Sequence, residues 1–351
     1  MSAPGRRPIC CRAVAAGFFY VSLALVLAGC ATPQMSQLQR DFPMGGEQAR
    51  LADAAFSTSA SLGVGARVEP PLPVRAMLAE VPFFAQDAYQ CGPAALAMVA
   101  QHAGVALRPD ELTSQVYVPG RQGAFPVEML AAARRQALLA YPLRPRIEDL
   151  LREVASGNPV LVFQNLSLPV YPVWHYAVVI GFDRERNTVT LHSGVTERLQ
   201  MSLFTFERTW ARGGHWAMVA LPPTRLPATA QADHFLVAAA ALERVQAAAA
   251  EVAYATALQA WPGQRAAQLG LGNTVYALGR KDEAAQRFLS ATQAHADFAD
   301  AWNNLAQVRL EQGRFKEAAD AIAQAVLIGG VRAESYRGLQ VQVEQQLQAG
   351  Q

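Results

Sequence analysis

Apolar residues follow three different patterns along the chain, and each pattern predicts a different structure. Residues 13–27 form a predominantly apolar run near the N-terminus. Between residues 75 and 222, short apolar runs alternate with turn residues, which is typical of strands. From residue 233 onward, apolar and small residues recur at helical spacing. We therefore expect a targeting segment, a domain of mixed helices and strands, and an all-α domain.

The middle segment opens with a strong helix signal. An apolar run starts near Cys91 and stops before Gly104, and Pro93 suits the first turn, where its missing N–H would have had no partner. A second, amphipathic helix is predicted over 124–136. A series of strands follows, which indicates an α+β domain. The predicted strands are 160–163, 174–183, 188–191 and 216–220, and a turn at 183–187 joins the second and third into a hairpin.

The C-terminal segment repeats with a period of 34 residues. Leu271 and Leu305 are one period apart, and so are Gly279 and Gly313. Together with the W-x-x-L-A motif at 302–306, this period resembles the tetratricopeptide repeat, a helical hairpin that stacks into a solenoid. Such stacks commonly offer a concave groove to a peptide or partner protein, although a purely structural role is the alternative. The expected repeats are 231–264, 265–298 and 299–332, with a capping helix after them and a Pro-rich linker at 223–232 before the 233–351 domain.

Composition and charge exclude some classes of function. The 351 residues carry a formal net charge of only +2, without a block of Lys and Arg. This argues against nucleic acid as a partner. The middle domain also has no P-loop, so we do not expect it to hydrolyse ATP.

The first thirty residues have the composition of a secretory signal. They contain arginines but no acidic residue, and the apolar run 13–27 is too short to span a bilayer comfortably. The segment ends in Leu-Ala-Gly-Cys30, which resembles the lipobox of bacterial lipoproteins, where the cysteine is acylated and becomes the new N-terminus. Without an aspartate after Cys30, the sequence is similar to the outer-membrane sorting pattern.

We therefore expect residues 1–30 to be a lipoprotein signal with its lipobox and residues 31–74 to be a flexible tether. The protein would be lipid-anchored in the cell envelope, at the outer membrane and facing the periplasm. An ordinary signal peptide with a chance cysteine is the alternative.

The cysteines indicate a reactive thiol. Cys10 and Cys11 leave with the signal and Cys30 carries lipid, so Cys91 remains alone in an oxidising compartment, where thiols are normally paired or absent. At a helix N-terminus, unpaired N–H groups and the helix dipole lower the pKa of a thiol. We therefore interpret Cys91 as a nucleophile, against the alternative of a small core residue.

A thiol nucleophile needs a base, and His175 at the start of the predicted hairpin is the preferred one. His102 lies eleven residues along the helix of Cys91, about 16 Å away by helical rise, and cannot serve. His215 is the second choice. His192 is expected to point from the other face of its strand.

QDAYQCGPAALAMV, followed by HYAVVIGFD, resembles the bacteriocin-processing (double-glycine leader) cysteine peptidases of the papain-like superfamily. The resemblance covers residues 80–221. It implies a papain-like fold in which Cys91 is the nucleophile, His175 the general base and Gln86 an oxyanion-hole donor. It implies no metal and no cofactor.

The chain departs from this family at one position. The family usually places an Asp on the strand after the histidine, but residues 192–194 read His-Ser-Gly. If Phe182 pairs with Thr188 across the turn, Ser193 lies on the same face as His175, on the diagonal. A hydroxyl can accept the imidazole N–H, but it cannot stabilise imidazolium as a carboxylate does.

Other residues are candidates to orient His175. Glu197 shares its face from the other diagonal if the strand continues past Gly194, and Asn165 ends a neighbouring strand. Asp183 is excluded because it lies eight residues along the same strand, about 26 Å away.

These observations predict a membrane-anchored cysteine peptidase whose Cys–His pair forms an acyl-enzyme and whose repeats recruit a protein or peptide. One alternative is an inactive peptidase-like envelope protein that binds a peptide or protein partner. Another is amide-forming transfer through the same acyl-enzyme, since only the acceptor differs.

Overall fold

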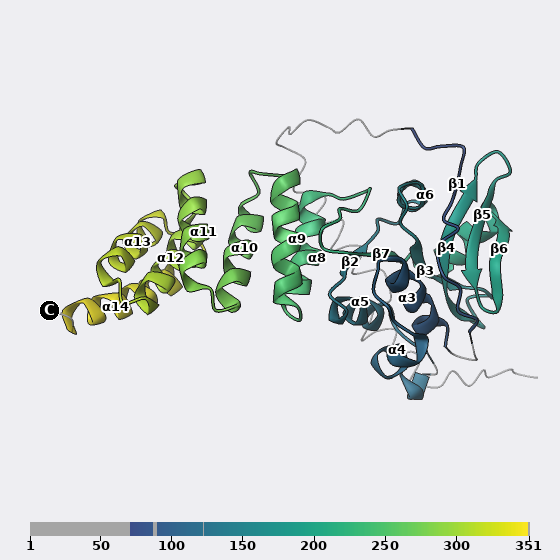
Figure 1. The fold of residues 1–351 in the computed structure, drawn as a ribbon, viewed down its shortest axis with the longest axis horizontal. Coiled ribbons are helices and arrows are strands. Elements are labelled where there is room, and N and C mark those ends of the chain that lie inside the picture. Colours follow the sequence, from purple (N-terminus) through teal and green to yellow (C-terminus); the bar gives the residue numbers. More distant parts are fainter. Residues whose placement is uncertain (1–70, 87–89, 122, 350–351) are drawn as a thin grey trace, which may run out of the picture.

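The computed structural model describes residues 71–86, 90–121 and 123–349 of the chain (Figure 1). The predicted signal, with Cys30, and the predicted tether up to residue 70 lie outside the described residues. Within the described part, no helix is both long and apolar enough to cross a membrane.

The middle domain is built on one seven-stranded sheet. The strand order is β2-β7-β3-β4-β5-β6, and β1 pairs with the C-terminal end of β4. All the pairings are antiparallel. The strands are β1 (Arg75–Met77), β2 (Leu139–Pro142), β3 (Val160–Asn165), β4 (Trp174–Asp183), β5 (Thr188–Ser193), β6 (Thr196–Ser202) and β7 (Ala217–Leu221).

Helices cover both faces of this sheet, because its central strands alternate apolar side chains between two cores. Leu161 and Val178 pack on one face with α3, α4 and α5. Val162 and Val179 pack on the other face with α6 and α7. This arrangement confirms the predicted α+β class. The helices are α3 (Cys91–His102), α4 (Pro109–Val116), α5 (Pro126–Arg135), α6 (Ile147–Ala155) and α7 (Leu203–Arg212), with a short 3-10 turn at Pro119–Arg121.

Helix α3 lies at the centre of the domain, where residues 92–100 are all buried. Gly92 permits a close approach at its N-terminus. A Cβ on Gly92 would lie 2.9 Å from the Cβ of Ala124 and 3.7 Å from the ring of Tyr176 on β4. The start of α3, with Cys91, is therefore held directly against β4.

The predicted hairpin register is wrong at its turn. Phe182 pairs with Val189, and Asp183 with Thr188, one residue away from the expected pairing. A bulge between Val179 and Gly181 then shifts the register, so that Ala177 pairs with Ser193. The bulge cancels the error at the turn, and Ser193 reaches the expected diagonal position from His175.

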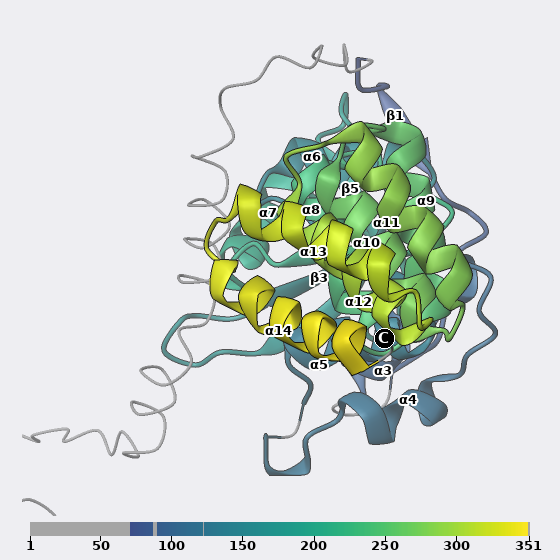
Figure 2. The ribbon, with the colours of Figure 1, turned by 90° about the vertical axis from the view of Figure 1, so that its left-hand side faces the viewer.

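The C-terminal domain consists of helical hairpins with the predicted period. Helices α10, α12 and α14 begin 34 residues apart, and so do α9, α11 and α13. The stack extends from the sheet domain to the C-terminus at the far end of the molecule (Figure 1), and Figure 2 looks along it. Its helices are α8 (Ala232–Glu243), α9 (Ala247–Ala260), α10 (Arg265–Ala277), α11 (Lys281–Ala294), α12 (Ala299–Glu311), α13 (Phe315–Ile328) and α14 (Ala333–Ala349).

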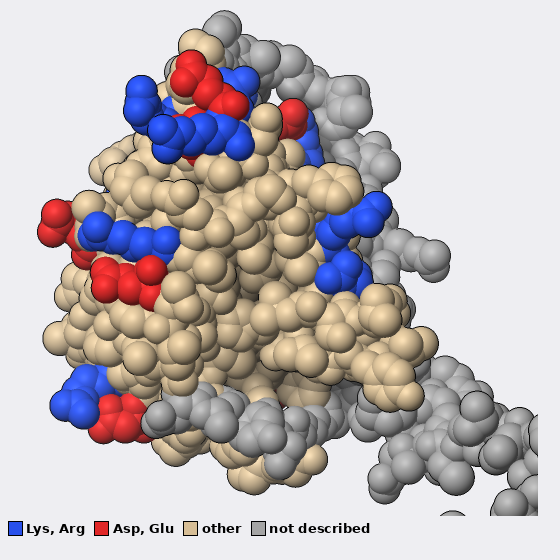
Figure 3. All heavy atoms as spheres, turned by 90° about the vertical axis from the view of Figure 1, so that its right-hand side faces the viewer, with Lys and Arg blue, Asp and Glu red and all other residues tan. Residues whose placement is uncertain are grey.

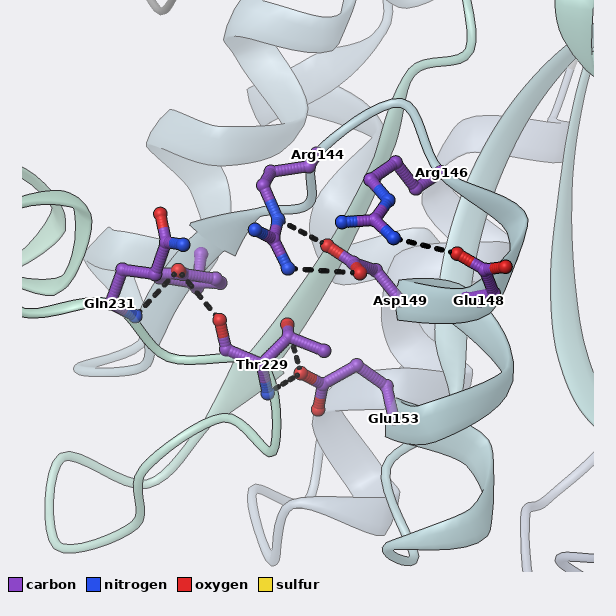
Figure 4. Close-up of polar contacts among 8 residues, drawn as sticks. Arg144, Arg146, Glu148, Asp149, Glu153, Thr229 and Gln231 are labelled. Atoms are coloured by element: carbon purple, nitrogen blue, oxygen red, sulfur yellow. Dashed lines mark hydrogen bonds and ion pairs between the residues drawn. The ribbon is translucent and has the colours of Figure 1, made fainter. Parts of the chain in front are cut away.

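The Pro-rich stretch 223–232 is packed against the sheet domain through a buried carboxylate. Glu153 on α6 is fully buried and accepts hydrogen bonds from the Thr229 N–H (2.8 Å) and hydroxyl (2.6 Å). It also accepts from the Ala228 N–H (3.1 Å) and the Asn158 amide (2.6 Å). Figure 4 shows Glu153 facing Thr229. Three of these four bonds join Glu153 on α6 to residues 228–229, so they fix the connection between the domains.

The two domains also share a core. Helix α8 packs on β2, and Phe235 belongs to the same apolar cluster as Val162 and Val179 of the sheet. Tyr141 on β2 accepts a hydrogen bond from the Gln231 N–H (3.3 Å). The sheet domain and the helical repeats therefore form one continuous body.

Candidate functional site

Cys91 is the first residue of α3, and its partly buried thiol is free. The backbone N–H groups of Tyr176, Gly92 and Cys91 itself favour the thiolate, but burial has the larger effect and raises the pKa of Cys91 above its ordinary value. A place at a helix N-terminus, taken alone, predicts a lowered pKa for this thiol. That prediction is wrong because it did not include desolvation.

His175 is the second residue of β4 and is half-buried. Its Nε2 lies 2.9 Å from the Oγ of Ser193 on β5. Burial lowers the pKa of His175 to about 4. At neutral pH both the thiol of Cys91 and the imidazole of His175 are therefore uncharged.

A chain of contacts brings the predicted site residues together. The Tyr176 N–H, which follows His175 directly, donates to the side chain of Cys91. His175 is bonded to Ser193, and the next residue, Gly194, accepts a hydrogen bond through its carbonyl from the Gln86 N–H at 3.2 Å. Cys91 thus lies beside the end of β4, where the pairing with β5 stops.

Gln86 has the geometry of a donor without a ligand. Its Nε2 is buried and has no hydrogen-bond partner among the described residues. A buried amide without a partner costs free energy, so an oxygen that accepts from it would be favoured. Its backbone N–H is bonded to the carbonyl of Gly194, so Gln86 lies beside the end of β5 and next to Ser193.

Of the three candidate orienters, only Ser193 is bonded to His175 within the described structure. Glu197 lies on exposed β6, with its carboxylate 3.7 Å from Arg198, because the chain turns at Gly194 instead of continuing as a strand. Asn165 is used elsewhere: its Oδ1 accepts from the backbone N–H groups of the β3–β4 loop.

The other histidines of the domain have structural partners. The Nε2 of His102 lies 3.0 Å from the Gly157 carbonyl, and that of His192 lies 3.1 Å from the Val81 carbonyl. His215, the second choice as base, lies 2.8 Å from a carboxylate oxygen of Glu207. None of these contacts involves Cys91.

Tyr176 is a positioning residue that sequence reasoning missed. Its hydroxyl donates to the Ala124 carbonyl (3.2 Å), and its N–H donates a hydrogen bond to the side chain of Cys91. Its ring packs beside Gly92, where a Cβ would lie 3.7 Å from it. It thereby links β4 to the start of α3. The only sequence signal was an aromatic residue directly after the candidate base.

In the described part of the chain, no group of three or more His, Cys, Asp or Glu could hold a metal ion.

The comparisons with known proteins agree with this architecture. Residues 78–218 match the model of the Peptidase_C39 like family, and residues 269–333 match a tetratricopeptide repeat model. No curated protein matches the chain.

Two solved structures are similar to parts of the chain. A C39-like peptidase from Bacillus anthracis is 20% identical, with a TM-score of 0.37, over 42% of this chain and 97% of that one. The Sgt2 TPR domain from Aspergillus fumigatus is 21% identical, with a TM-score of 0.32, over 35% of this chain and 82% of that one. From the two family matches, the chain combines a C39-like peptidase domain with a C-terminal tetratricopeptide-repeat domain.

Proposed function

We propose that the middle domain is a cysteine peptidase that cleaves peptide bonds through an acyl-enzyme on Cys91. The observation that carries the proposal is the contact chain through Tyr176, His175, Ser193 and Gln86 around a free thiol at a helix N-terminus. No other thiol in the described residues competes for this role.

The proposed reaction begins from neutral groups. With Nε2 bonded to Ser193, Nδ1 of His175 takes the thiol proton as Sγ of Cys91 attacks the peptide carbonyl. Gln86 Nε2 and backbone N–H groups hold the oxyanion. The C–N bond then breaks, and the imidazolium returns the proton to the leaving amine. Water, deprotonated by His175, hydrolyses the thioester and restores the thiol.

The missing carboxylate supports a second candidate function. Ser193 provides no negative charge to stabilise imidazolium, and the pKa values of His175 and Cys91 both disfavour an ion pair. An inactive domain that binds a peptide or protein would retain the same fold without this requirement.

Digestion of a random decapeptide library, read by mass spectrometry, separates the two candidates. The peptidase should create new termini, whereas Cys91→Ala and His175→Ala should leave the library intact. Intact peptides with the wild-type protein, together with retained peptide binding, would favour the inactive binding protein. A new amide formed only when a primary amine is added would indicate transfer.

We further propose that Cys30 is acylated and anchors the protein at the outer membrane facing the periplasm, and that the repeats recruit a peptide or protein. The lipobox-like sequence before Cys30 supports the anchor. Labelling with an alkyne fatty acid should modify the wild-type protein and not Cys30→Ala. Labelling that persists in this variant would exclude Cys30 as the acylated residue.

A further inference from the structure

The loop between β3 and β4 exposes several apolar side chains just before His175 in the chain. We call residues 166–174 the apolar loop. It contains no charged residue, and it ends at Trp174, directly before His175. Val170 and Tyr171 at its tip are 74% and 78% exposed. The other exposed apolar side chains of the loop are Leu166, Leu168, Val173 and Trp174.

Hydrogen bonds hold this loop in one conformation. The Oδ1 of Asn165 accepts from the N–H groups of Ser167 and Val173, both at 3.0 Å. The Leu166 N–H donates to the Val173 carbonyl at 2.9 Å, and the Tyr171 N–H donates to the Leu168 carbonyl at 3.1 Å. These bonds satisfy four backbone N–H groups of the loop, while its apolar side chains remain exposed.

The loop is continuous with the proposed catalytic residues. The ring of Trp174 stacks on Phe163 with centroids 5.1 Å apart, and Phe163 in turn contacts Tyr176, which serves Cys91. A ligand that contacts Trp174 would therefore lie at the end of a packed row of rings that leads to Tyr176, whose N–H donates to Cys91. Loop side chains that are already ordered also reduce the entropy that a ligand must lose on binding.

The distribution of charge on the sheet domain does not favour a strongly charged partner. Figure 3 shows the side formed by β1, β5 and β6, where uncharged atoms fill the middle and charged side chains lie in small separate groups around the margin. Most of these groups contain both signs, and one at the right contains Lys and Arg only. A strongly acidic or basic partner would therefore find no broad field of opposite sign on this side.

We propose that the apolar loop is a substrate-binding surface of the peptidase, which takes apolar side chains of an extended peptide next to the scissile bond. This inference rests on the proposed function. A lipid bilayer is the less favoured occupant, because a bilayer seated on Trp174 would also cover the neighbouring His175 and close the site to peptides.

The test measures peptide binding separately from cleavage, in the full chain with Cys91→Ala. The probes are fluorescent decapeptides with three adjacent leucines and matched peptides with three serines. The variant Leu168→Ser/Val170→Ser/Tyr171→Ser changes only exposed side chains at the loop tip. It should weaken binding of the leucine peptides at least tenfold and change that of the serine peptides less than twofold. Leu327→Ser on α13, where Leu327 is 78% exposed, is the matched control and should have no effect.

The outcomes distinguish this inference from the proposed function. The protein with Cys91→Ala could show loop-dependent peptide binding while the protein that retains Cys91 shows no cleavage. This result would overturn the proposed peptidase activity but support the apolar loop as a peptide-binding surface. Equal binding of leucine peptides by the loop variant and its parent, or no binding by either, would overturn the inference. It would also be overturned if the loop variant lost binding only to phosphatidylethanolamine–phosphatidylglycerol vesicles. As a control, the loop substitutions are also made in the protein that retains Cys91. An unchanged rate of Cys91 alkylation there verifies that the site is intact.

Discussion

The Oγ of Ser193 lies 2.9 Å from the Nε2 of His175, on the diagonal across the β4–β5 pair. This is where a carboxylate would hold and charge the imidazole. The hydroxyl holds the ring but adds no charge, so burial alone sets the pKa of His175, at about 4. At neutral pH the thiol of Cys91 and the imidazole of His175 are therefore both uncharged.

Restoring the carboxylate with Ser193→Asp should create an ion pair. A negative charge at hydrogen-bond distance should raise the pKa of His175 by about 1 to 3 units and favour the thiolate of Cys91. We expect alkylation of Cys91 by iodoacetamide at pH 7 to become about tenfold faster, measured by peptide mass spectrometry. Ser193→Ala should give no such gain. If Asp and Ala behaved alike, charge at position 193 would not control the thiol.

Burial of neutral His175 should make stability depend on pH. His175 has a pKa near 6.5 in the unfolded chain but about 4 in the folded protein. The unfolded state therefore holds more protons than the folded state between these pH values. Stability should fall by about 3 kcal/mol as pH decreases from 6.5 to 4. His175→Gln should lose this part of the slope in urea unfolding. Identical slopes in both proteins would contradict the buried neutral state.

Removal of the Gln86 side chain should affect turnover and not the nucleophile. Its Nε2 has no partner among the described residues, so Gln86→Ala breaks no internal side-chain bond there. If this amide holds the oxyanion, kcat should fall by about 10²- to 10³-fold. The alkylation rate of Cys91 should stay within twofold. A parallel loss of both rates would indicate a structural role instead.

Glu153→Gln should destabilise the junction between the domains. The carboxylate accepts from the Thr229 N–H and hydroxyl and two other donors, and an amide would place an N–H against one of them. We expect a loss of about 2 to 4 kcal/mol in urea unfolding. Glu148→Gln is the matched control, because the exposed pair of Glu148 with Arg146 should contribute less than about 1 kcal/mol. Similar losses in the two variants would contradict a special role for Glu153.

Close packing in the repeats should make one glycine sensitive to substitution. A Cβ on Gly270 of α10 would overlap the ring of Tyr254 on α9. Gly270→Ala should therefore lower thermal stability, by about 1 to 3 kcal/mol. Gly338→Ala on α14 meets no atom within 4 Å and should be neutral or stabilising by up to about 1 kcal/mol. The prediction fails if both substitutions stabilise the protein.

Local patterns in the sequence were sufficient for the helix after Cys91, the strand that begins near His175, and the 34-residue repeat. A helix start is marked by residues next to one another, and a repeat by spacing along the chain, so both can be identified without tertiary contacts. The pleat also has a local period of two, so an assumed register was enough to predict which residues of the hairpin share a face.

Only the tertiary structure decided the hairpin register, the state of the thiol and the use of the side chains around it. A bulge between Val179 and Gly181 shifts the β4–β5 register, and the prediction of Ser193 succeeded only because this bulge cancelled an error at the turn. Burial reversed the expected shift in the pKa of Cys91, because desolvation depends on every element packed around the thiol. Asn165 could not be assigned to its loop from sequence, since its partners are chosen by the fold. Sequence thus determined which groups are present and on which elements, whereas long-range packing determined their distances and their charge.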